Sequence, residues 1–547
     1  MNLADELKKI IKGEVVTDEK ILDEMSRDAG LLVVKPAVVV YPKDVNDLKN
    51  LVKFVGENKK SNKELSLTSR SAGTDMSGGP LNESIIVNFT KYFTNFRMKD
   101  SNSVIAEPGL YYRIFEKEML RYGLIFPSYP ASKSICAIGG IVNNNSGGEK
   151  TLKYGKTENF IEGISMVLSD GNEYNFHALN EEGLKSKMKQ KDFEGEIYKN
   201  MYKLITKNYK LITEAKPDVT KNSAGYLLWN VYNKEEGIFD LTQIFVGAQG
   251  TLGIMKDATI RLVPIKKRAR MLVIFLNDVK KLKDLIPIIL KTNPESFETY
   301  DDNTLKLAMR FFPSFAKILG AKNLVRIAFS FLPEFFMLLR GGLPKLILQV
   351  EFSGDDNGEL DAKIEELSRE LKPFDLNLRA PKTQFGAKKY WTIRRESFNL
   401  LRHHIKDKHT APFIDDFAVK PEKLPQFLPE LDLILEQYKL IYTIAGHVGD
   451  GNFHIIPLMN LKDEAQRNII PELSEKVYNL VFKYNGTTTG EHNDGLIRSP
   501  YLKQMYGEKV FKLFEETKKI FDPQNIFNPG KKIGSSLEYT LSHIRKD

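Results

Sequence analysis

Residues 64–89, ELSLTSRSAGTDMSGGPLNESIIVNF, place a glycine-rich loop between two segments with strand character. The loop, residues 70–79, carries three glycines together with Ser, Thr and Asp side chains. Successive backbone N–H groups in such a loop can form a nest for a phosphate group. The loop lacks the lysine of a P-loop and does not lead straight into a helix, so a plain turn is the other interpretation.

The flanking sequence alternates between strand and helix patterns. Residues 38–41 are a β-branched run, and the segment after Asp44 has helical apolar spacing with that aspartate as its N-cap. Residues 104–176 repeat the alternation with glycine at each joint, which indicates backbone that turns tightly or approaches another group closely. The basic run KKRAR, residues 266–270, follows a predicted strand, and we place the first domain boundary there.

Composition limits the class of protein. The chain has 547 residues, 42% hydrophobic and 28% charged, which predicts two or three globular domains. The net charge of +9 comes from scattered lysines, so no nucleic acid partner is expected. The single cysteine, Cys136, excludes an internal disulfide and an iron–sulfur cluster held by thiolates of this chain.

The sequence predicts a cytoplasmic protein. The start, MNLADELKKIIKG, does not resemble a secretory signal, and no stretch reaches the roughly 20 apolar residues that cross a bilayer. Residues 311–344 combine many aromatic side chains with Lys and Arg. We consider two interpretations of this segment, a helical hairpin that buries its aromatics and a peripheral contact with the inner face of the membrane.

Histidines gather in two short stretches near the end of the chain. In residues 446–454, GHVGDGNFH, the pair Asp450-Gly451 is a hairpin turn signal that would place His454 directly opposite His447. Residues 486–492, GTTTGEH, add Glu491 beside His492. Two histidines and a carboxylate make an open site for zinc, iron or manganese, although hydrogen-bonded loop histidines are the alternative.

Residues 390–395, YWTIRR, set two arginines after aromatic side chains. An arginine fork binds a carboxylate through two parallel hydrogen bonds, which suits an acidic substrate. A surface salt bridge is the other interpretation.

Taken in order, the motifs resemble those of the FAD-linked oxidases of the vanillyl-alcohol-oxidase (PCMH) type. The likeness is to their D-2-hydroxyacid dehydrogenase branch, which includes D-lactate dehydrogenases, the glycolate oxidase catalytic subunit and D-2-hydroxyglutarate dehydrogenase. It covers about residues 26–265 and 385–535. The motifs include SRDA (26–29), RSAGTDMSGG (70–79), GLIFPSYPAS (123–132), IGGIVNNNSGG (138–148), VGAQGTLGI (246–254), FIDDFAV (413–419), GHVGDGNFH, TGEH and FDPQNIFNPGKKI (521–533).

The resemblance implies an α+β fold with an FAD-binding domain of two α+β subdomains over residues 1–268. An α+β cap domain over residues 269–500 and a C-terminal helical segment over residues 501–547 complete it. FAD is then the cofactor, and no histidine stands where relatives attach it covalently, so we expect it to be non-covalent. The implied FAD-binding residues are Ser71, Ala72, Gly73, Thr74, Asp75, Pro130, Ser132, Gly139, Gly140, Asn144, Gly148, Gly253 and Ile254.

The resemblance also assigns roles in the cap. His447, His454 and Glu491 match the metal ligands, His492 the general base, and Arg394 the clamp for the substrate carboxylate. The implied reaction is oxidation of a small D-2-hydroxy acid to the 2-oxo acid, with hydride transfer to flavin N5. Asp450 is expected to orient a ligand histidine or to stabilise the turn.

Several positions depart from the family. Gln249 replaces a glutamate, the residues after His492 are Asn-Asp-Gly, and Ile456 stands where D-2-hydroxyglutarate enzymes have an amide. Electrons are expected to leave to a quinone, an iron–sulfur protein or another electron-transfer protein. Two further functions stay open, a non-redox enzyme resembling alkylglycerone-phosphate synthase and a flavin-bearing subunit of a larger complex.

Overall fold

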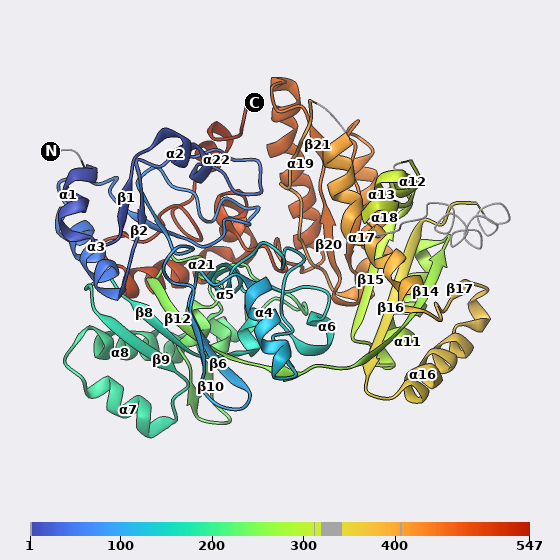
Figure 1. Cartoon of the computed structure of the whole chain (residues 1–547), viewed down its shortest axis with the longest axis horizontal. Helices are drawn as coiled ribbons and strands as arrows, with labels where there is room; N and C mark the ends of the chain where they lie inside the picture. The colour runs from blue at the N-terminus through green and yellow to red at the C-terminus, as the bar shows by residue number, and fades with distance from the viewer. Residues whose placement is uncertain (1–2, 311, 319–341, 405–406) are drawn as a thin grey trace.

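The computed structural model describes residues 3–310, 312–318, 342–404 and 407–547 (Figure 1). Most of the aromatic and basic segment 311–344 lies outside these ranges, so both interpretations of it stay predictions. Within the described residues, none of the helices combines the length and apolar character needed to cross a membrane.

The first part of the chain forms a small sheet, and two of its strands, β3 and β4, flank the glycine-rich loop. Its four strands run in the order β1-β2-β4-β3, and β2, β4 and β3 are parallel. Helix α3 (Val45–Asn58) buries Leu48, Leu51, Val52 and Val55 against this sheet, and the Asp44 carboxylate caps its first turn as predicted. The strands are β1 (Glu14–Val16), β2 (Val38–Tyr41), β3 (Leu67–Arg70) and β4 (Ile85–Asn88).

A second, antiparallel sheet of five strands follows, in the order β5-β6-β12-β8-β9. Its core includes side chains of α4 (Tyr112–Arg121), α5 (Ile138–Asn144) and α8 (Phe193–Lys207). The strands are β5 (Phe96–Met98), β6 (Ser103–Ala106), β8 (Ile161–Val167), β9 (Glu173–His177) and β12 (Ile254–Arg261). The glycine-rich joints of residues 104–176 therefore connect the elements of this sheet.

The third sheet has six antiparallel strands in the order β17-β14-β16-β15-β19-β20. One core contains side chains of α11 (Leu282–Lys291), α16 (Asn357–Glu370) and α18 (Leu424–Leu435), and a separate core contains those of α12 (Asp302–Arg310) and α17 (Gln384–His404). The strands are β14 (Arg268–Leu276), β15 (Ser296–Asp301), β16 (Leu346–Gly354), β17 (Asn377–Arg379), β19 (Ile444–His447) and β20 (Asn452–Ile455). Residues 262–267 lie between the last strand of the second sheet and the first strand of the third.

The C-terminal segment returns to the first half of the chain (Figure 1). Helix α21 (Leu502–Phe521) buries Val510, Leu513, Phe514 and Phe521 in the core of the second sheet. The short helix α22 (Leu537–Ser542) precedes Ile544, which forms an isolated bridge to Leu32. The exact domain limits stay a prediction, but the predicted α+β class is confirmed by these three sheets and their helices.

Candidate active site

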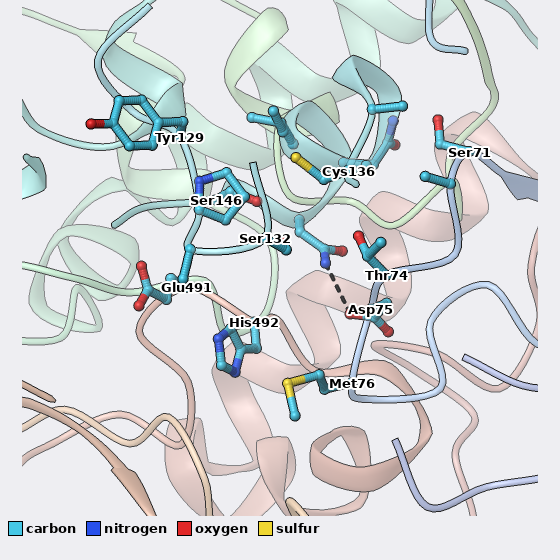
Figure 2. Close-up of a pocket in the computed structure, with 18 of the residues that line it drawn as sticks. Ser71, Thr74, Asp75, Met76, Tyr129, Ser132, Cys136, Ser146, Glu491 and His492 are labelled. Carbon is cyan, nitrogen blue, oxygen red and sulfur yellow. Dashed lines mark hydrogen bonds between the residues drawn. The ribbon is translucent and has the colours of Figure 1, made fainter. Parts of the chain in front are cut away.

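A cavity of about 370 Å³ lies where the first half of the chain meets the third sheet. Figure 2 shows the loop residues Ser71, Thr74 and Asp75 on one side of it and Glu491 and His492 on another. Most of the predicted cofactor residues line it, namely Ser71, Ala72, Gly73, Thr74, Asp75, Pro130, Ser132, Gly139, Gly140, Asn144 and Gly148. Gly253 and Ile254 are not among its lining residues; Ile254 is buried in the core of the first sheet.

The glycine-rich loop begins where β3 ends, at Arg70. Gly73 has φ of +66°, and a Cβ there would lie 2.3 Å from Nη2 of Arg70, so both the turn and the close approach require glycine. The Asp75 carboxylate accepts hydrogen bonds from Asn144 Nδ2 (2.9 Å; Figure 2) and from the Gly79 backbone N–H (2.7 Å). The first of these bonds joins the loop to α5, and the second closes the loop on itself.

Two glycines beside the cavity serve different purposes. A Cβ on Gly148 would lie 2.1 Å from the Tyr129 carbonyl oxygen, so this glycine permits close packing of two backbone segments. A Cβ on Gly140 would meet no atom within 4 Å, and this residue lines the cavity. The backbone at Gly140 is therefore open to a flat cofactor, and the residues present fit FAD.

The two strands that carry the histidines pair in a different register from the predicted one. His447 lies opposite Asn452, and His454 lies opposite Ala445. The prediction of a two-residue turn was wrong because Val448–Asp450 form a turn of 3-10 helix and Gly451 closes it with φ of +65°. His447 and His454 still share one face of the hairpin, with ring centroids 5.4 Å apart.

The three predicted metal ligands converge in the cavity. Glu491 Oε1 lies 2.9 Å from His447 Nε2 and 3.1 Å from His454 Nε2. Glu491 Oε2 is buried and has no hydrogen-bond partner among the described residues. Two imidazole nitrogens and a buried carboxylate are the donor set that zinc, iron and manganese accept, so the residues present fit such an ion.

Two buried carboxylates hold the other ring nitrogens of these histidines. Glu298 on β15 lies 2.7 Å from His447 Nδ1. Asp415 lies 3.1 Å from His454 Nδ1 and 2.6 Å from His492 Nδ1. A carboxylate behind a histidine fixes the orientation of the ring and the nitrogen that carries the proton. Each histidine therefore has its Nδ1 engaged, which leaves Nε2 for chemistry.

The neighbouring Asp416 has a different task. With φ of +73°, its carboxylate accepts hydrogen bonds from the backbone N–H groups of Glu491 (3.0 Å) and His492 (2.6 Å). It also accepts from Thr489 Oγ1 (2.5 Å) and Asn452 Nδ2 (3.1 Å). One ion could be surrounded by Asp416, His454, Glu491 and His492, which lie close together. The four hydrogen bonds nevertheless make Asp416 the residue that fixes the shape of the loop at residues 489–492.

Arg394, the predicted clamp, lines the cavity from α17 and forms an ion pair with Glu298. Lys221 is fully buried and lies 3.7 Å from Glu491 Oε2 and 3.4 Å from Asp450. Asp450 is therefore engaged with a lysine, whereas the carboxylates that contact the histidines are Glu298, Asp415 and Glu491.

The charges of the site shift several pKa values. Burial acts to raise the pKa of Glu491, but Lys221 and His447 outweigh it and hold that pKa well below the usual range. Burial acts to lower the pKa of His454, but Asp415 and Glu491 raise it to about 10. For His492 burial is likewise outweighed by Asp416 and Asp415, which raise its pKa. This concentration of acids attracts cations.

Sequence reasoning missed the roles of four residues, Glu298, Asp415, Asp416 and Lys221. The two aspartates fall in the FIDDFAV motif, where two acids within an apolar run were the available signal. Glu298 lies about 150 residues before His447, and Lys221 lies about 270 residues before Glu491. No local pattern around them indicates that role.

Family models match two parts of the chain. Residues 36–176 match the FAD binding domain, and residues 265–532 match the C-terminal domain of FAD linked oxidases. The chain belongs to the FAD-linked oxidases, as the motifs predicted, and FAD is the cofactor that its domains bind.

Relatives of known name fall in the predicted branch. The D-2-hydroxyglutarate dehydrogenase of Pantoea ananatis is 27% identical over 530 residues, which cover 95% of this chain and 50% of that protein. The D-lactate dehydrogenase of Archaeoglobus fulgidus is 25% identical over 535 residues, 97% of this chain and 99% of that protein. The chain thus spans about half the length of the first relative and nearly all of the second.

The structure of p-cresol methylhydroxylase with bound substrate superposes with a TM-score of 0.68 at 13% identity. The match covers 97% of this chain and 96% of that one. This likeness confirms the predicted PCMH-type fold.

Proposed function

We propose that the protein oxidises a small D-2-hydroxy acid of the lactate, glycolate or 2-hydroxyglutarate class to the 2-oxo acid, with FAD and a divalent metal ion. One observation carries the proposal. The acid–histidine cluster of His447, His454, Glu491 and His492 and the arginine Arg394 line the same cavity as the FAD loop, residues 71–75. The names of the relatives support this substrate class.

The bound groups supply the steps that protein side chains cannot. Residues 71–75 would hold FAD, which would supply a hydride acceptor, and His447, His454 and Glu491 would hold a divalent ion, which would supply Lewis-acid chemistry. We expect FAD to be held without a covalent bond, so acid precipitation of the protein should release the flavin into the supernatant.

The chain's own residues bind the substrate and move its proton. Arg394 provides a guanidinium that can bind the substrate carboxylate in the cavity. His492 accepts the hydroxyl proton at Nε2, because its Nδ1 is hydrogen-bonded to Asp415. His492 would be kept neutral if its neighbours held a dication, because like charges repel and protonation of the imidazole would then be disfavoured.

The cavity wall bears on the choice of acid. Ile456 lies in the lining, so at this position the wall offers an apolar contact and no amide. This favours a short side chain such as that of D-lactate over a long dicarboxylate, because a buried carboxylate needs a polar partner.

An anaerobic panel tests the proposal. Purified protein with D-lactate, glycolate or D-2-hydroxyglutarate should lose its visible flavin absorbance with at least one acid. If none of them bleaches the flavin, the proposal is wrong. The non-redox synthase and the accessory subunit both predict that outcome, but the complete acid–histidine cluster favours the dehydrogenase.

A further inference from the structure

A surface around α4 exposes an unusual number of apolar side chains. Ten large apolar side chains are exposed among the described residues, and five of them fall on α4 or on segments that touch it. We call these five the α4 surface: Ile114, Leu120, Tyr122, Ile135 and Ile265. The segments are joined by hydrogen bonds from Arg113 Nη1 to the Ser134 carbonyl (2.9 Å) and from the Ile265 N–H to the Gly123 carbonyl (2.9 Å).

Cations outnumber acids around this surface. Arg113, Lys117 and Arg121 are exposed on α4, and Lys266 and Lys267 of the basic run follow Ile265 directly. Arg121 is paired with Glu118 and Lys266 with Asp355, so the surplus positive charge comes from Arg113, Lys117 and Lys267. A cavity of about 330 Å³ adjoins this surface at Leu120 and Ile265, and its lining also includes Glu116, Tyr129, Lys133, Lys150 and Lys266. Apolar groups with a charged rim are typical of a protein interaction site.

The α4 surface lies next to the cofactor cavity. Tyr129 and Lys133 line both cavities, so single side chains separate the two. Lys133 Nζ lies 4.5 Å from the centre of the Tyr129 ring and 2.8 Å from Glu116 of α4. A redox centre seated on this surface would therefore lie close to the cofactor cavity.

We propose that the α4 surface is the docking site of a separate, acidic electron-carrier protein. The inference rests on the proposed function, since oxidation of each hydroxy acid leaves two electrons and one proton on the flavin. Two successive one-electron transfers to two carrier molecules restore the oxidised flavin and release the proton to water. Positive charges around the site attract an acidic partner and orient it before contact.

The shape of the surface favours a protein over a membrane. The two exposed apolar residues of α4, Ile114 and Leu120, are six residues apart, which places them roughly 120° apart around the helix axis. They do not form the single apolar stripe of a helix that lies in a bilayer interface. The cavity beside Leu120 and Ile265 suits a protruding side chain of a folded partner.

The test uses two haem proteins of opposite charge as probes, the acidic soluble domain of cytochrome b5 and a basic mitochondrial cytochrome c. The flavin is reduced photochemically without any hydroxy acid, so the result does not depend on the proposed substrate. Stopped-flow absorbance then gives the second-order rate of reoxidation by each probe, and titration of the oxidised proteins gives Kd.

The variant Lys117→Glu/Arg121→Glu reverses two exposed charges one helical turn apart on α4. The matched control is the variant Lys203→Glu/Lys207→Glu, which reverses two exposed charges with the same spacing on α8. For cytochrome b5 at low salt, we expect the α4 variant to lose about tenfold or more in both rate and affinity, and the α8 variant to change little. The wild-type rate should fall as salt is added.

Equal losses in the two variants would mean that only net charge matters, and no loss in either would remove the α4 surface as a docking site. If the α4 variant instead loses binding to vesicles of anionic phospholipid while its reaction with cytochrome b5 is unchanged, the surface faces a membrane and the proposal is wrong. Absence of flavin reduction by hydroxy acids in the panel above would contradict the proposed function alone.

Discussion

Two carboxylates, Glu298 and Asp415, set the geometry of the three histidines in the cavity. Glu298 contacts the Nδ1 atom of His447, and Asp415 contacts the Nδ1 atoms of both His454 and His492. Asp415 therefore joins a metal ligand to the proposed base, so one residue positions both. The favourable charge of the two imidazoles outweighs burial and lowers the pKa of Asp415.

Replacement of Asp415 tests this positioning role. Asp415→Asn keeps the size of the side chain but removes its charge and offers an amide to one of the two imidazoles. We expect flavin reduction by the hydroxy acid to slow about 10- to 100-fold, with loss of bound metal, because carboxylates behind metal-binding histidines have effects of this size. Single-turnover absorbance and metal analysis of the purified variant provide the measurement.

Asp301→Asn is the matched control for that change. Asp301 is also buried, but its carboxylate accepts hydrogen bonds from the Thr304 backbone N–H (2.9 Å) and hydroxyl (2.6 Å), whereas Asp415 contacts two histidines. Equal slowing in both variants, or full activity and metal content in Asp415→Asn, would show that Asp415 does not position the histidines.

Gly140 tests where the cofactor lies. Gly140→Leu places a side chain in open cavity space, so the apoprotein should fold while FAD binding is lost or weakened at least tenfold, because the leucine occupies the cofactor's volume. Flavin absorbance per protein and circular dichroism are the measurements. Ala362→Leu, on the exposed face of α16, should retain FAD; retention of FAD by Gly140→Leu as well would contradict the placement.

At the level of elements, the hairpin β19–β20 was predicted from the sequence pattern, but the length of its turn was not. Asp450-Gly451 was a sound turn signal, but the sequence does not say how many residues the turn contains. A Cβ on Gly451 would lie 1.7 Å from the Val419 carbonyl oxygen, so a distant segment packs against the turn and helps to determine its form. The two histidines share a face in either register because both registers preserve the alternation of side chains.

The contact between β16 and α17 makes stability depend on pH. Trp391 Nε1 of α17 donates a hydrogen bond of 2.9 Å to Glu351 of β16. Burial, with smaller contributions from Glu149 and Glu295, raises the pKa of Glu351 from 4.5 to about 7. Between these two pH values the folded chain binds one more proton than the unfolded chain, so the free energy of unfolding falls as pH rises.

Glu351→Gln removes this dependence while an oxygen remains to accept the Trp391 hydrogen bond. We expect the variant to be more stable than the wild type by about 1–3 kcal/mol at pH 8 and by much less at pH 5. Urea unfolding at the two pH values measures the difference. Glu365→Gln, exposed on α16, should show no such change; a Glu351→Gln effect that is equal at both pH values would rule out ionisation of Glu351 as its cause.

For the whole molecule, the strand–helix–strand start came from patterns that short windows contain, whereas the α+β class and the C-terminal helix were implied by the resemblance of the ordered motifs to the FAD-linked oxidases. The ordered motifs together, and no single motif, predicted that one cavity contains residues 71–75, Arg394 and the cluster at 447–492. What the sequence did not reveal are contacts between side chains distant in the chain, such as those of Glu298 and Lys221, because their local surroundings look like ordinary strand and loop.

The α4 surface also belongs to this scale. Its apolar residues are scattered over residues 114–265, so only the fold brings them together. The basic run 266–270, first noted as a domain joint, borders the same surface.

The central claim is that His492 takes the hydroxyl proton of a D-2-hydroxy acid at the flavin. Anaerobic stopped-flow absorbance of wild type and His492→Ala, with the acid that bleaches the flavin, measures it most directly. We expect the variant to retain FAD and to be reduced at least about 100-fold more slowly, the contribution of a positioned general base. A variant that keeps FAD and is reduced at the wild-type rate would contradict the claim.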